Sequence, residues 1–176
     1  MDHTIAAAVR ELIVETGYSG LTMDAVAARA GVGKAAIYRR HSSKASLVFA
    51  SLLHGATPQP LPRTGTLRGD LTALAETIVG DIANPLAMAA APGLMADLAE
   101  QPEVAELFRQ TFFAGEQAEI EGILSRHGVT ADAELLHAQM LGTAFAWLYL
   151  LRKPLTPGLP GHIVASALAS LGQPEN

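Results

Sequence analysis

The sequence predicts an all-α protein on three observations. Hydrophobic residues make up 49% of the 176 residues, but aromatic residues only 5%, so the apolar content is mainly alanine, leucine and valine. Alanine and leucine are strong helix formers. Apolar residues recur at i, i+3 and i+4 along most of the chain, which is the spacing of amphipathic helices. Glycine and proline clusters separate these segments, as expected for helices joined by turns.

The first two predicted helices cover residues 4–16 and 23–30. Four apolar residues share one face of the first helix: Ile5, Val9, Leu12 and Ile13. The sequence GYSG at 17–20 then supplies turn residues. Thr22 can cap the second helix with its hydroxyl group. Gly31 can end that helix because glycine adopts the left-handed conformation at little cost.

Two more short helices, at 34 to about 40 and at 44–54, complete a predicted N-terminal domain over residues 1–54. The sequence HSSK at 41–44 separates them. The stretch GATPQPLPRTGT at 55–66 follows, with three prolines and two glycines. This composition predicts a linker.

Residues 67–176 are predicted to form a second helical domain. Its expected helices lie at about 67–83, 85–100, 103–126, 131–152 and 160–171. The longest apolar run, at 140–151, is shorter than the roughly 20 residues that a bilayer requires, so it predicts a buried core helix. The first residues lack the basic region of a signal peptide. We therefore expect no membrane segment and a cytoplasmic protein.

Charge is distributed unevenly between the two predicted domains. Residues 1–54 hold six Lys or Arg against four Asp or Glu, whereas residues 55–176 hold six against thirteen. Such a split is typical of a chain in which one part contacts a polyanion, although small basic surpluses are also common. The absence of cysteine excludes disulfides, thiolate metal sites and cysteine nucleophiles.

The chemistry-bearing motif is a pair of short helices joined by a glycine turn, which is the helix-turn-helix layout. Ala27 is small where the two helices cross, and Gly31 makes the turn. Four apolar residues are expected to hold the helices together: Val26, Ala30, Val32 and Ile37. The second helix would then fit into a DNA major groove, which is wide enough to admit one.

If Ile37 faces inward, six residues of the second helix remain outside: Lys34, Ala35, Ala36, Tyr38, Arg39 and Arg40. Arginine can bind a guanine edge through two hydrogen bonds. Tyr38 and Lys44 are better suited to phosphate contacts, which fix register without reading sequence. The alternative is a solvated basic helix face without a ligand.

The stretch GLTMDAVAARAGVGKAAIYRRHSSKASL at 20–47 resembles the DNA-binding domain of the TetR/AcrR family of transcriptional regulators. The resemblance implies phosphate contacts from Thr22, Tyr38 and Lys44. It implies base contacts from the turn and the recognition helix, at the positions Gly33, Lys34, Ala35, Ala36, Arg39 and Arg40.

Two positions depart from the family pattern. Ala36 stands where the family often has threonine, so a hydroxyl contact is expected to be missing. His41 stands where an aromatic residue normally packs against the first helix. We therefore expect His41 to be a packing residue rather than a sensor or a ligand.

Residues 67–171 resemble the C-terminal ligand-binding and dimerisation domain of the same family more loosely. The resemblance implies that the helices at about 131–152 and 160–171 pair with those of a second copy in a four-helix interface. Gly142 and Ala146 share a face and would let a partner helix approach closely. Packing within one chain is the alternative.

An unknown small, largely apolar effector is the expected ligand of this domain. Large adaptable side chains and one polar residue are its candidate contacts: Met88, Met95, Phe108, Phe112, Phe113, His137, Met140 and Trp147. Methionine and aromatic residues suit such pockets, although they also fill ordinary cores. The acidic cluster of Glu116, Glu119 and Glu121 is expected to be a solvated helix face.

No nucleophile motif, phosphate-binding loop or histidine pair at ligand spacing occurs in the sequence. We therefore expect no catalytic residue, no metal and no cofactor. The predicted function is a homodimeric, ligand-responsive transcriptional regulator that acts as a repressor on a near-palindromic DNA operator. Two alternatives stay open: a helical small-molecule-binding enzyme with a vestigial DNA-binding module, and a nonspecific DNA-compacting protein.

Overall fold

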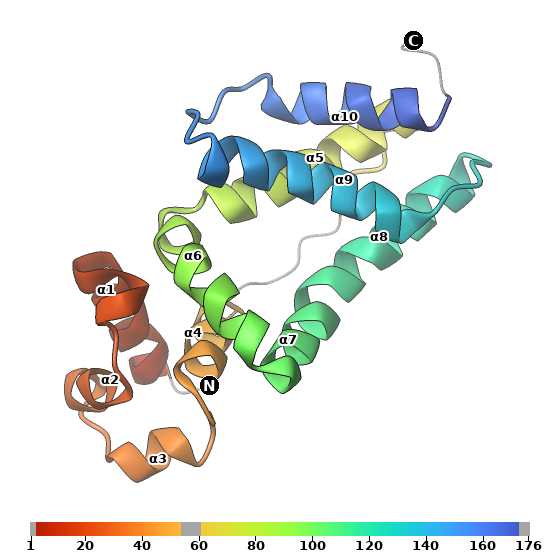
Figure 1. Ribbon diagram of the computed structural model, residues 1–176. Helices are drawn as coiled ribbons and strands as arrows, with labels where there is room; N and C mark the ends of the chain where they lie inside the picture. The colour runs from red at the N-terminus through yellow and green to blue at the C-terminus, as the bar shows by residue number, and fades with distance from the viewer. Residues whose placement is uncertain (1–2, 54–60, 173–176) are drawn as a thin grey trace. The chain divides into compact units, whose positions relative to one another are not determined.

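The computed structural model describes residues 3–53 and 61–172, and within these residues it contains helices and no strands (Figure 1). The predicted all-α class is confirmed. The helical elements are α1 (His3–Gly20), α2 (Met23–Ala30), α3 (Lys34–Tyr38), α4 (Lys44–Leu53), α5 (Leu67–Ala83), α6 (Pro85–Glu100), α7 (Pro102–Phe108), a π-helical segment η1 (Arg109–Phe113), α8 (Ala114–Arg126), α9 (Ala133–Phe145), a second π-helical segment η2 (Ala146–Leu150) and α10 (Leu159–Ser170). These helices form two compact units, one from residues 1–58 and 85–108 and one from residues 59–84 and 109–176.

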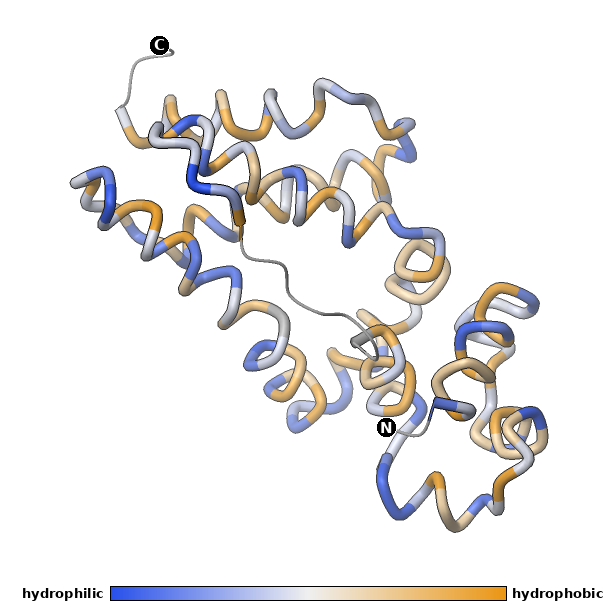
Figure 2. Tube along the Cα trace, turned by 180° about the vertical axis from the view of Figure 1, so that it is seen from behind, coloured by the Kyte–Doolittle hydropathy of each residue, from blue (hydrophilic) through white to orange (hydrophobic). Residues whose placement is uncertain are grey.

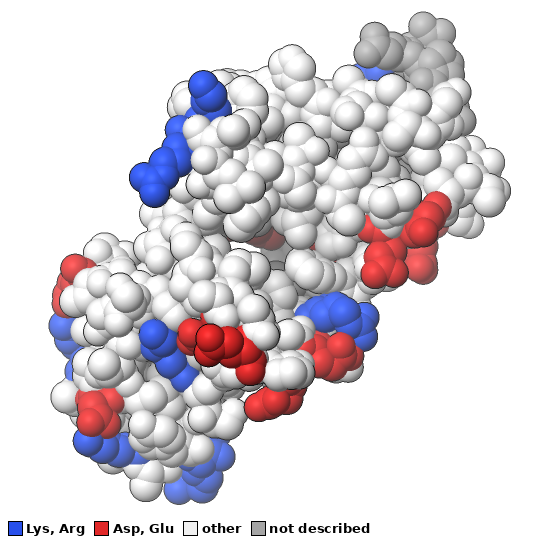
Figure 3. Space-filling model, viewed as in Figure 1, with Lys and Arg blue, Asp and Glu red and all other residues white. Residues whose placement is uncertain are grey.

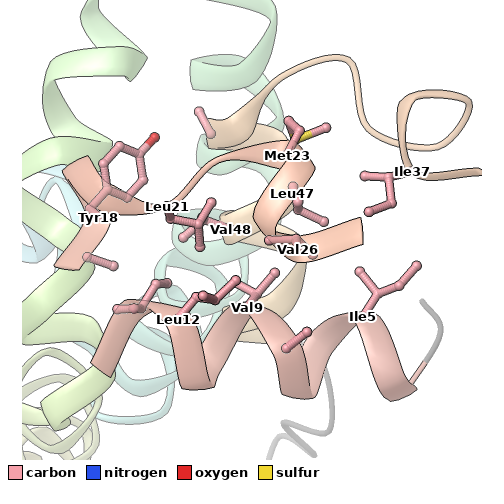
Figure 4. Close-up of a cluster of buried hydrophobic side chains, with 14 of the residues drawn as sticks. Ile5, Val9, Leu12, Tyr18, Leu21, Met23, Val26, Ile37, Leu47 and Val48 are labelled. Atoms are coloured by element: carbon pink, nitrogen blue, oxygen red, sulfur yellow. The ribbon is translucent and has the colours of Figure 1, made fainter. Parts of the chain in front are cut away.

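The first unit is built around α1, which packs against α2, α4 and α6. The apolar face predicted for residues 4–16 is buried, with Ile5, Val9, Leu12 and Ile13 all in the core. Figure 4 shows Ile5, Val9 and Leu12 on the side of α1 that faces the other helices. The same core contains Val26 of α2, Ile37 of α3, and Leu47 and Val48 of α4. The amphipathic pattern of α1 therefore provides the surface on which the shorter helices are assembled.

The two units defined by packing differ from the two predicted domains in the placement of residues 85–108. Residues 85–108 were expected to belong to the C-terminal domain, but α6 and α7 pack on α1 and α4. The reason is that Ala90, Leu94 and Val104 are buried in the N-terminal core. Helical spacing shows that a segment has an apolar face, but not which neighbour covers it. Residues 54–60 of the predicted linker lie outside the described residues.

Helix boundaries also differ from the expectations in two places. The single helix expected at 103–126 is α7, η1 and α8, with five π-helical residues between the two α-helices. The helix expected at 131–152 is α9 followed by η2, which ends at Leu150. Pro92 lies inside α6 without ending it, although proline removes one backbone donor from a helix interior.

The second unit packs α5 against α8, α9 and α10, and α9 also contacts α8 and α10. Hydrophobic and hydrophilic residues alternate along these helices (Figure 2). Its core is made of aliphatic side chains and one methionine, including Leu71, Ile78, Ile120, Met140 and Val164. Among the described residues no single helix is long and apolar enough to span a membrane. The bent pair α5 and α6 reaches the required length and apolar composition when the two helices are taken together.

A buried carboxylate anchors the start of α5 in the second unit. Asp70 is 3% exposed. Its Oδ1 accepts hydrogen bonds from the backbone N–H (2.7 Å) and the hydroxyl (2.8 Å) of Thr64. Its Oδ2 lies 3.3 Å from Nη2 of Arg126 and 3.1 Å from Nε2 of His127, at the end of α8. The hydrogen bond from the Thr64 amide lowers the pKa of Asp70 most, and the hydrogen bond with His127 is the second cause. Together they hold this pKa well below its ordinary value.

The first prediction concerns the pH dependence of this anchor. Because the pKa of Asp70 is lowered in the folded chain, its contribution to the free energy of unfolding is present above the unfolded pKa, which is 3.8, and is lost as the pH falls below it. We expect Asp70→Asn to cost about 2 kcal/mol at pH 7. Urea unfolding followed by circular dichroism should show that this difference shrinks below about pH 4.

Glu119→Gln is the matched control, since Glu119 is exposed on α8 and the same charge is removed. It should leave the free energy of unfolding within about 0.5 kcal/mol of the original chain at every pH. A constant Asp70→Asn deficit from pH 7 to pH 3 would contradict the electrostatic account and indicate a packing effect.

Candidate nucleic-acid interface

The turn between α2 and α3 is fixed by a cap at each end of α2. The Thr22 hydroxyl accepts a hydrogen bond from the Ala25 N–H at 3.1 Å and caps the start of the helix. Gly31, at φ 66°, ends the helix in the left-handed conformation. The Val32 N–H donates to the Ala27 carbonyl at 3.0 Å and the Gly31 N–H to that of Ala28 at 3.3 Å, as in a Schellman motif. Both caps lie where the sequence predicts them.

One buried side chain, Ile37, packs α3 against the core of the first unit. Ile37 is completely buried and points toward Met23 and Val26 (Figure 4). The helix covers Lys34–Tyr38, shorter than the expected 34–40, and Arg39 continues it as a helical cap residue. His41 is buried, and burial, with Arg40 nearby, lowers its pKa. The neutral, buried His41 matches the packing role expected for it.

The predicted contact residues of α3 lie outside, around the buried Ile37. Lys34, Ala35, Tyr38, Arg39 and Arg40 are exposed, and Ala36 is half-buried. Tyr38 is 53% exposed to solvent, which is a large fraction for an aromatic residue. Among the described residues Arg39 and Arg40 form no ion pair, so both guanidinium groups stay available.

Three acidic residues of α1 and α2 are paired with cations other than these arginines. Arg29 of α2 bridges to Glu15 at 2.7 Å and to Glu11 at 3.1 Å, both on α1. Lys34 pairs with Asp24, the acid in the first turn of α2. Blue side chains gather at the end of the molecule where α3 lies (Figure 3). The surface around Arg39 and Arg40 is therefore one of the positive regions of an acidic chain.

Lys44, for which a phosphate contact is expected, contacts Tyr18 in this structure. It is the first residue of α4 and is half-buried. Its Nζ lies 4.2 Å from the centroid of the Tyr18 ring and donates to the Tyr18 carbonyl at 3.4 Å. The ammonium group is therefore held at the end of α1, next to the start of α4.

The predicted effector contacts are divided between the two units. Met88, Met95 and Phe108 belong to the first unit, and the Phe108 ring lies 5.0 Å from that of Phe49. The side chain of Phe112 lies outside the described residues.

In the second unit the structure brings together Phe113 and His137. Their rings lie 5.3 Å apart in an edge-on arrangement. Met140 is completely buried in the core, and Trp147 donates from Nε1 to the Pro154 carbonyl at 3.1 Å. These contacts describe packing and do not test the predicted effector site.

Sequence reasoning missed the role of Glu116. It was assigned to a solvated face, but its side chain is only 22% exposed and its Oε2 lies 2.5 Å from Nε2 of the buried His137. No local signal reveals this pair, because the two residues are 21 positions apart on different helices. The one feature of the sequence that suggested a distant partner was His137, a polar residue within the apolar pattern of its helix.

The outer faces of α9 and α10 lack charged residues. No Lys, Arg, Asp or Glu occurs at residues 135–151 or 159–171. A shallow groove runs along α9 and η2, lined by Ala138, Gln139, Gly142, Thr143, Ala146, Trp147 and Leu151. Gln139 accepts from the Ser170 hydroxyl at 3.0 Å and donates to that of Ser166 at 3.3 Å, which ties the exposed sides of the two helices together. The groove is uncharged and is lined by small residues such as Ala138, Gly142 and Ala146, together with the larger Trp147 and Leu151.

Two family models match the chain. The model described as "Bacterial regulatory proteins, tetR family" matches residues 5–51. The model described as "Tetracyclin repressor-like, C-terminal domain" matches residues 61–167, which is more than half of the chain.

Curated relatives carry the same description. An uncharacterized HTH-type transcriptional regulator of Mycobacterium tuberculosis is 34% identical over 123 residues, which are 69% of this chain and 60% of that protein. The chain thus spans less than two thirds of the length of this relative. A "DNA-binding transcriptional repressor TetR" of Mycobacteroides abscessus is 41% identical over 71 residues, 39% of this chain and 37% of that protein.

Among solved structures, a TetR family transcription regulator designated SCO0332 is similar over 98% of this chain and 97% of its own, with a TM-score of 0.71 and 22% identity. A TetR transcriptional regulator of Agrobacterium tumefaciens is similar over 94% and 91% of the two chains, with a TM-score of 0.68 and 17% identity. At these identities the likeness shows the fold.

The second prediction compares the two glycines of the turn. Gly31 has φ 66°, so Gly31→Ala should lower the free energy of unfolding by about 1 kcal/mol, because an alanine is strained there. Gly33 has φ −69° and open space around it, so Gly33→Ala should be neutral or slightly stabilising. Thermal denaturation of the two variants checks this, and equal melting temperatures would contradict the left-handed role of Gly31.

Proposed function

The chain belongs to the TetR family of DNA-binding transcriptional regulators, and we propose that it is a ligand-responsive repressor that binds a near-palindromic operator as a homodimer. One observation carries the proposal: Tyr38, Arg39 and Arg40 are exposed on a helix whose orientation Ile37 and the Gly31 turn fix. A helix presented in this way fits a DNA major groove.

The proposed DNA contacts are of two kinds: phosphate contacts that position the protein on the duplex, and base contacts that recognise the sequence. Thr22 and Tyr38, with Lys44, bind phosphate and set the register of the protein on the duplex. Arg39 reads a guanine edge through two hydrogen bonds, and Arg40 is a further candidate. Four positions at the start of α3 approach the bases or the backbone: Gly33, Lys34, Ala35 and Ala36. Since alanine offers only a methyl group, Ala35 and Ala36 can discriminate through apolar contact with a thymine methyl group.

We propose that two copies pair through α9 and α10. The supporting feature is the uncharged outer face of these helices, in which small residues such as Ala138, Gly142 and Ala146 would let partner helices approach closely. A two-fold axis through this face would present two α3 helices to half-sites one helical turn apart, about 34–36 Å. The predicted segments, about 131–152 and 160–171, include both helices.

A small, largely apolar effector is proposed to bind the second unit and release the operator. Its candidate contacts there are Phe113, His137, Met140 and Trp147. The effector must bind the releasing state more tightly than the DNA-binding state, since equal affinity shifts no equilibrium. The repressor role is proposed from the description of the matched Mycobacteroides abscessus protein, and it places the chain in the bacterial cytoplasm with its operator.

We propose that the chain acts as a regulator and not as an enzyme. The enzyme alternative predicts that Arg39→Ala leaves activity unchanged. The nonspecific DNA-compacting alternative predicts equal affinity for every duplex, whereas a regulator should bind its operator at least about a thousandfold more tightly than unrelated DNA.

The third prediction tests sequence reading by α3. A duplex selected from a random-sequence library by the purified chain should contain a near-palindrome, protected in footprinting. Arg39→Ala should weaken binding to that duplex by about tenfold to a hundredfold, because one bidentate base contact is lost. Binding to unrelated duplexes should change much less.

Arg63→Ala is the control, since Arg63 is also exposed but lies outside α2, α3 and α4. It removes the same charge and should leave operator affinity nearly unchanged. If no duplex is enriched, or if both variants lose affinity equally on all sequences, specific recognition by α3 is refuted.

The fourth prediction tests the dimer face. Gly142 is exposed in the groove of α9, so Gly142→Glu would bury a charge without a partner at the proposed interface. Light scattering after size exclusion should give the mass of one chain for this variant and of two chains for the original. Gly115→Glu, at an exposed and open position on α8, should remain dimeric. A dimeric Gly142→Glu variant would place the interface elsewhere.

A further inference from the structure

Tyr18 is the residue at which α1, α4 and α6 of the first unit meet. It is 4% exposed and follows Gly17, which breaks α1 at φ 69°. Its hydroxyl donates a hydrogen bond to Oδ2 of Asp97, on α6, at 2.5 Å. Burial is the main cause that raises the pKa of Tyr18, and the hydrogen bond to Asp97 raises it further. The hydroxyl therefore stays protonated and donates at neutral pH.

The ring itself is confined by α6 and carries a cation. A Cβ atom at Gly93 of α6 would come within 2.3 Å of Cδ1 of Tyr18, so only glycine allows the ring its place. The Lys44 Nζ lies 4.2 Å from the ring centroid and also donates to the Tyr18 carbonyl. Lys44 is thus held by a residue whose own position depends on α6.

The geometry points to Tyr18 as a positioning residue that places the Lys44 ammonium for its contact with a DNA phosphate, with Asp97 of α6 holding Tyr18 in place. This inference rests on the proposed function. Lysine loses much rotamer freedom when it is fixed, so a lysine aligned in advance binds its phosphate with a smaller entropic cost. The Asp97 carboxylate polarises the Tyr18 hydroxyl, which strengthens the attraction of the ring for a cation.

The sign of the effect separates this role from simple electrostatics. Asp97 carries a negative charge in the unit that binds DNA, and removal of a negative charge ordinarily strengthens DNA binding. If Asp97 acts through Tyr18 and Lys44, its removal must instead weaken DNA binding. The loss must also disappear when Lys44 is absent, because the described contacts link Asp97 to Lys44 through Tyr18.

The experiment measures binding of the full chain to a fluorescent 30-base-pair duplex of mixed sequence by anisotropy, at a series of salt concentrations. Asp97→Asn should weaken binding about threefold to tenfold and flatten the salt dependence, because one phosphate contact contributes a slope of about 0.9. In a Lys44→Ala chain Asp97→Asn should cause no loss, and binding should stay unchanged or become slightly stronger, as expected for the removal of a negative charge. Tyr18→Phe, which keeps the ring, should give the same loss, and the double variant with Asp97→Asn should be no worse.

Glu100→Gln is the matched control, since Glu100 is an exposed acid on the same helix. It should leave binding unchanged or strengthen it slightly. Melting temperatures of all variants are recorded in parallel, because a folding defect lowers the active fraction without changing the salt slope. Gly93→Ala displaces the ring without a change of charge and should also weaken binding.

Three results would overturn the inference. Stronger binding by Asp97→Asn would mean that only its charge matters. An equal loss in the Lys44→Ala chain would mean that Asp97 acts through the fold as a whole. An unchanged salt slope would separate Asp97 from any phosphate contact. Failure of the original chain to bind any duplex at low salt is a different outcome, since it refutes the proposed function itself.

Discussion

The burial of Ile37 is the interaction on which the proposed interface depends. The helix that carries it, α3, has five residues, and helices shorter than about 12 residues are marginal on their own in water. Its shape and direction therefore come from outside: from Ile37 in the α1–α2–α4 core and from the left-handed Gly31 turn. With these two points fixed, Tyr38, Arg39 and Arg40 lie exposed at the end of α3.

The pairing of charges explains how an acidic chain can present a basic end. Two acids of α1 are occupied by Arg29, and Asp24 is occupied by Lys34. Surface pairs of this kind add little stability, but they remove negative charge from the neighbourhood of α3. Arg39 and Arg40 are left as unpaired cations there, and unpaired cations can displace the counterions of a phosphate backbone.

The features that sequence could predict are those determined by nearby residues. Thr22 as a cap, Gly31 as a left-handed stop and Ile37 as a buried anchor each follow from their neighbours within a few positions. Contacts between distant residues could not be predicted in this way. Glu116 was assigned to solvent because its partner is on another helix. The packing of α6 in the first unit was not predicted, because an apolar face does not identify the neighbour that covers it.

The packing of α6 also changes what counts as the DNA-binding unit. A module ending at residue 54 would leave Tyr18 without its partner Asp97 and Phe49 without the Phe108 ring. It would also lose the cover that Ala90, Leu94 and Val104 provide to the N-terminal core. The chain reaches this segment from α5 and leaves it through η1, both of which have residues in the second unit. The helices that would contact DNA therefore share a core with a segment whose two ends are covalently attached to the proposed effector-binding unit.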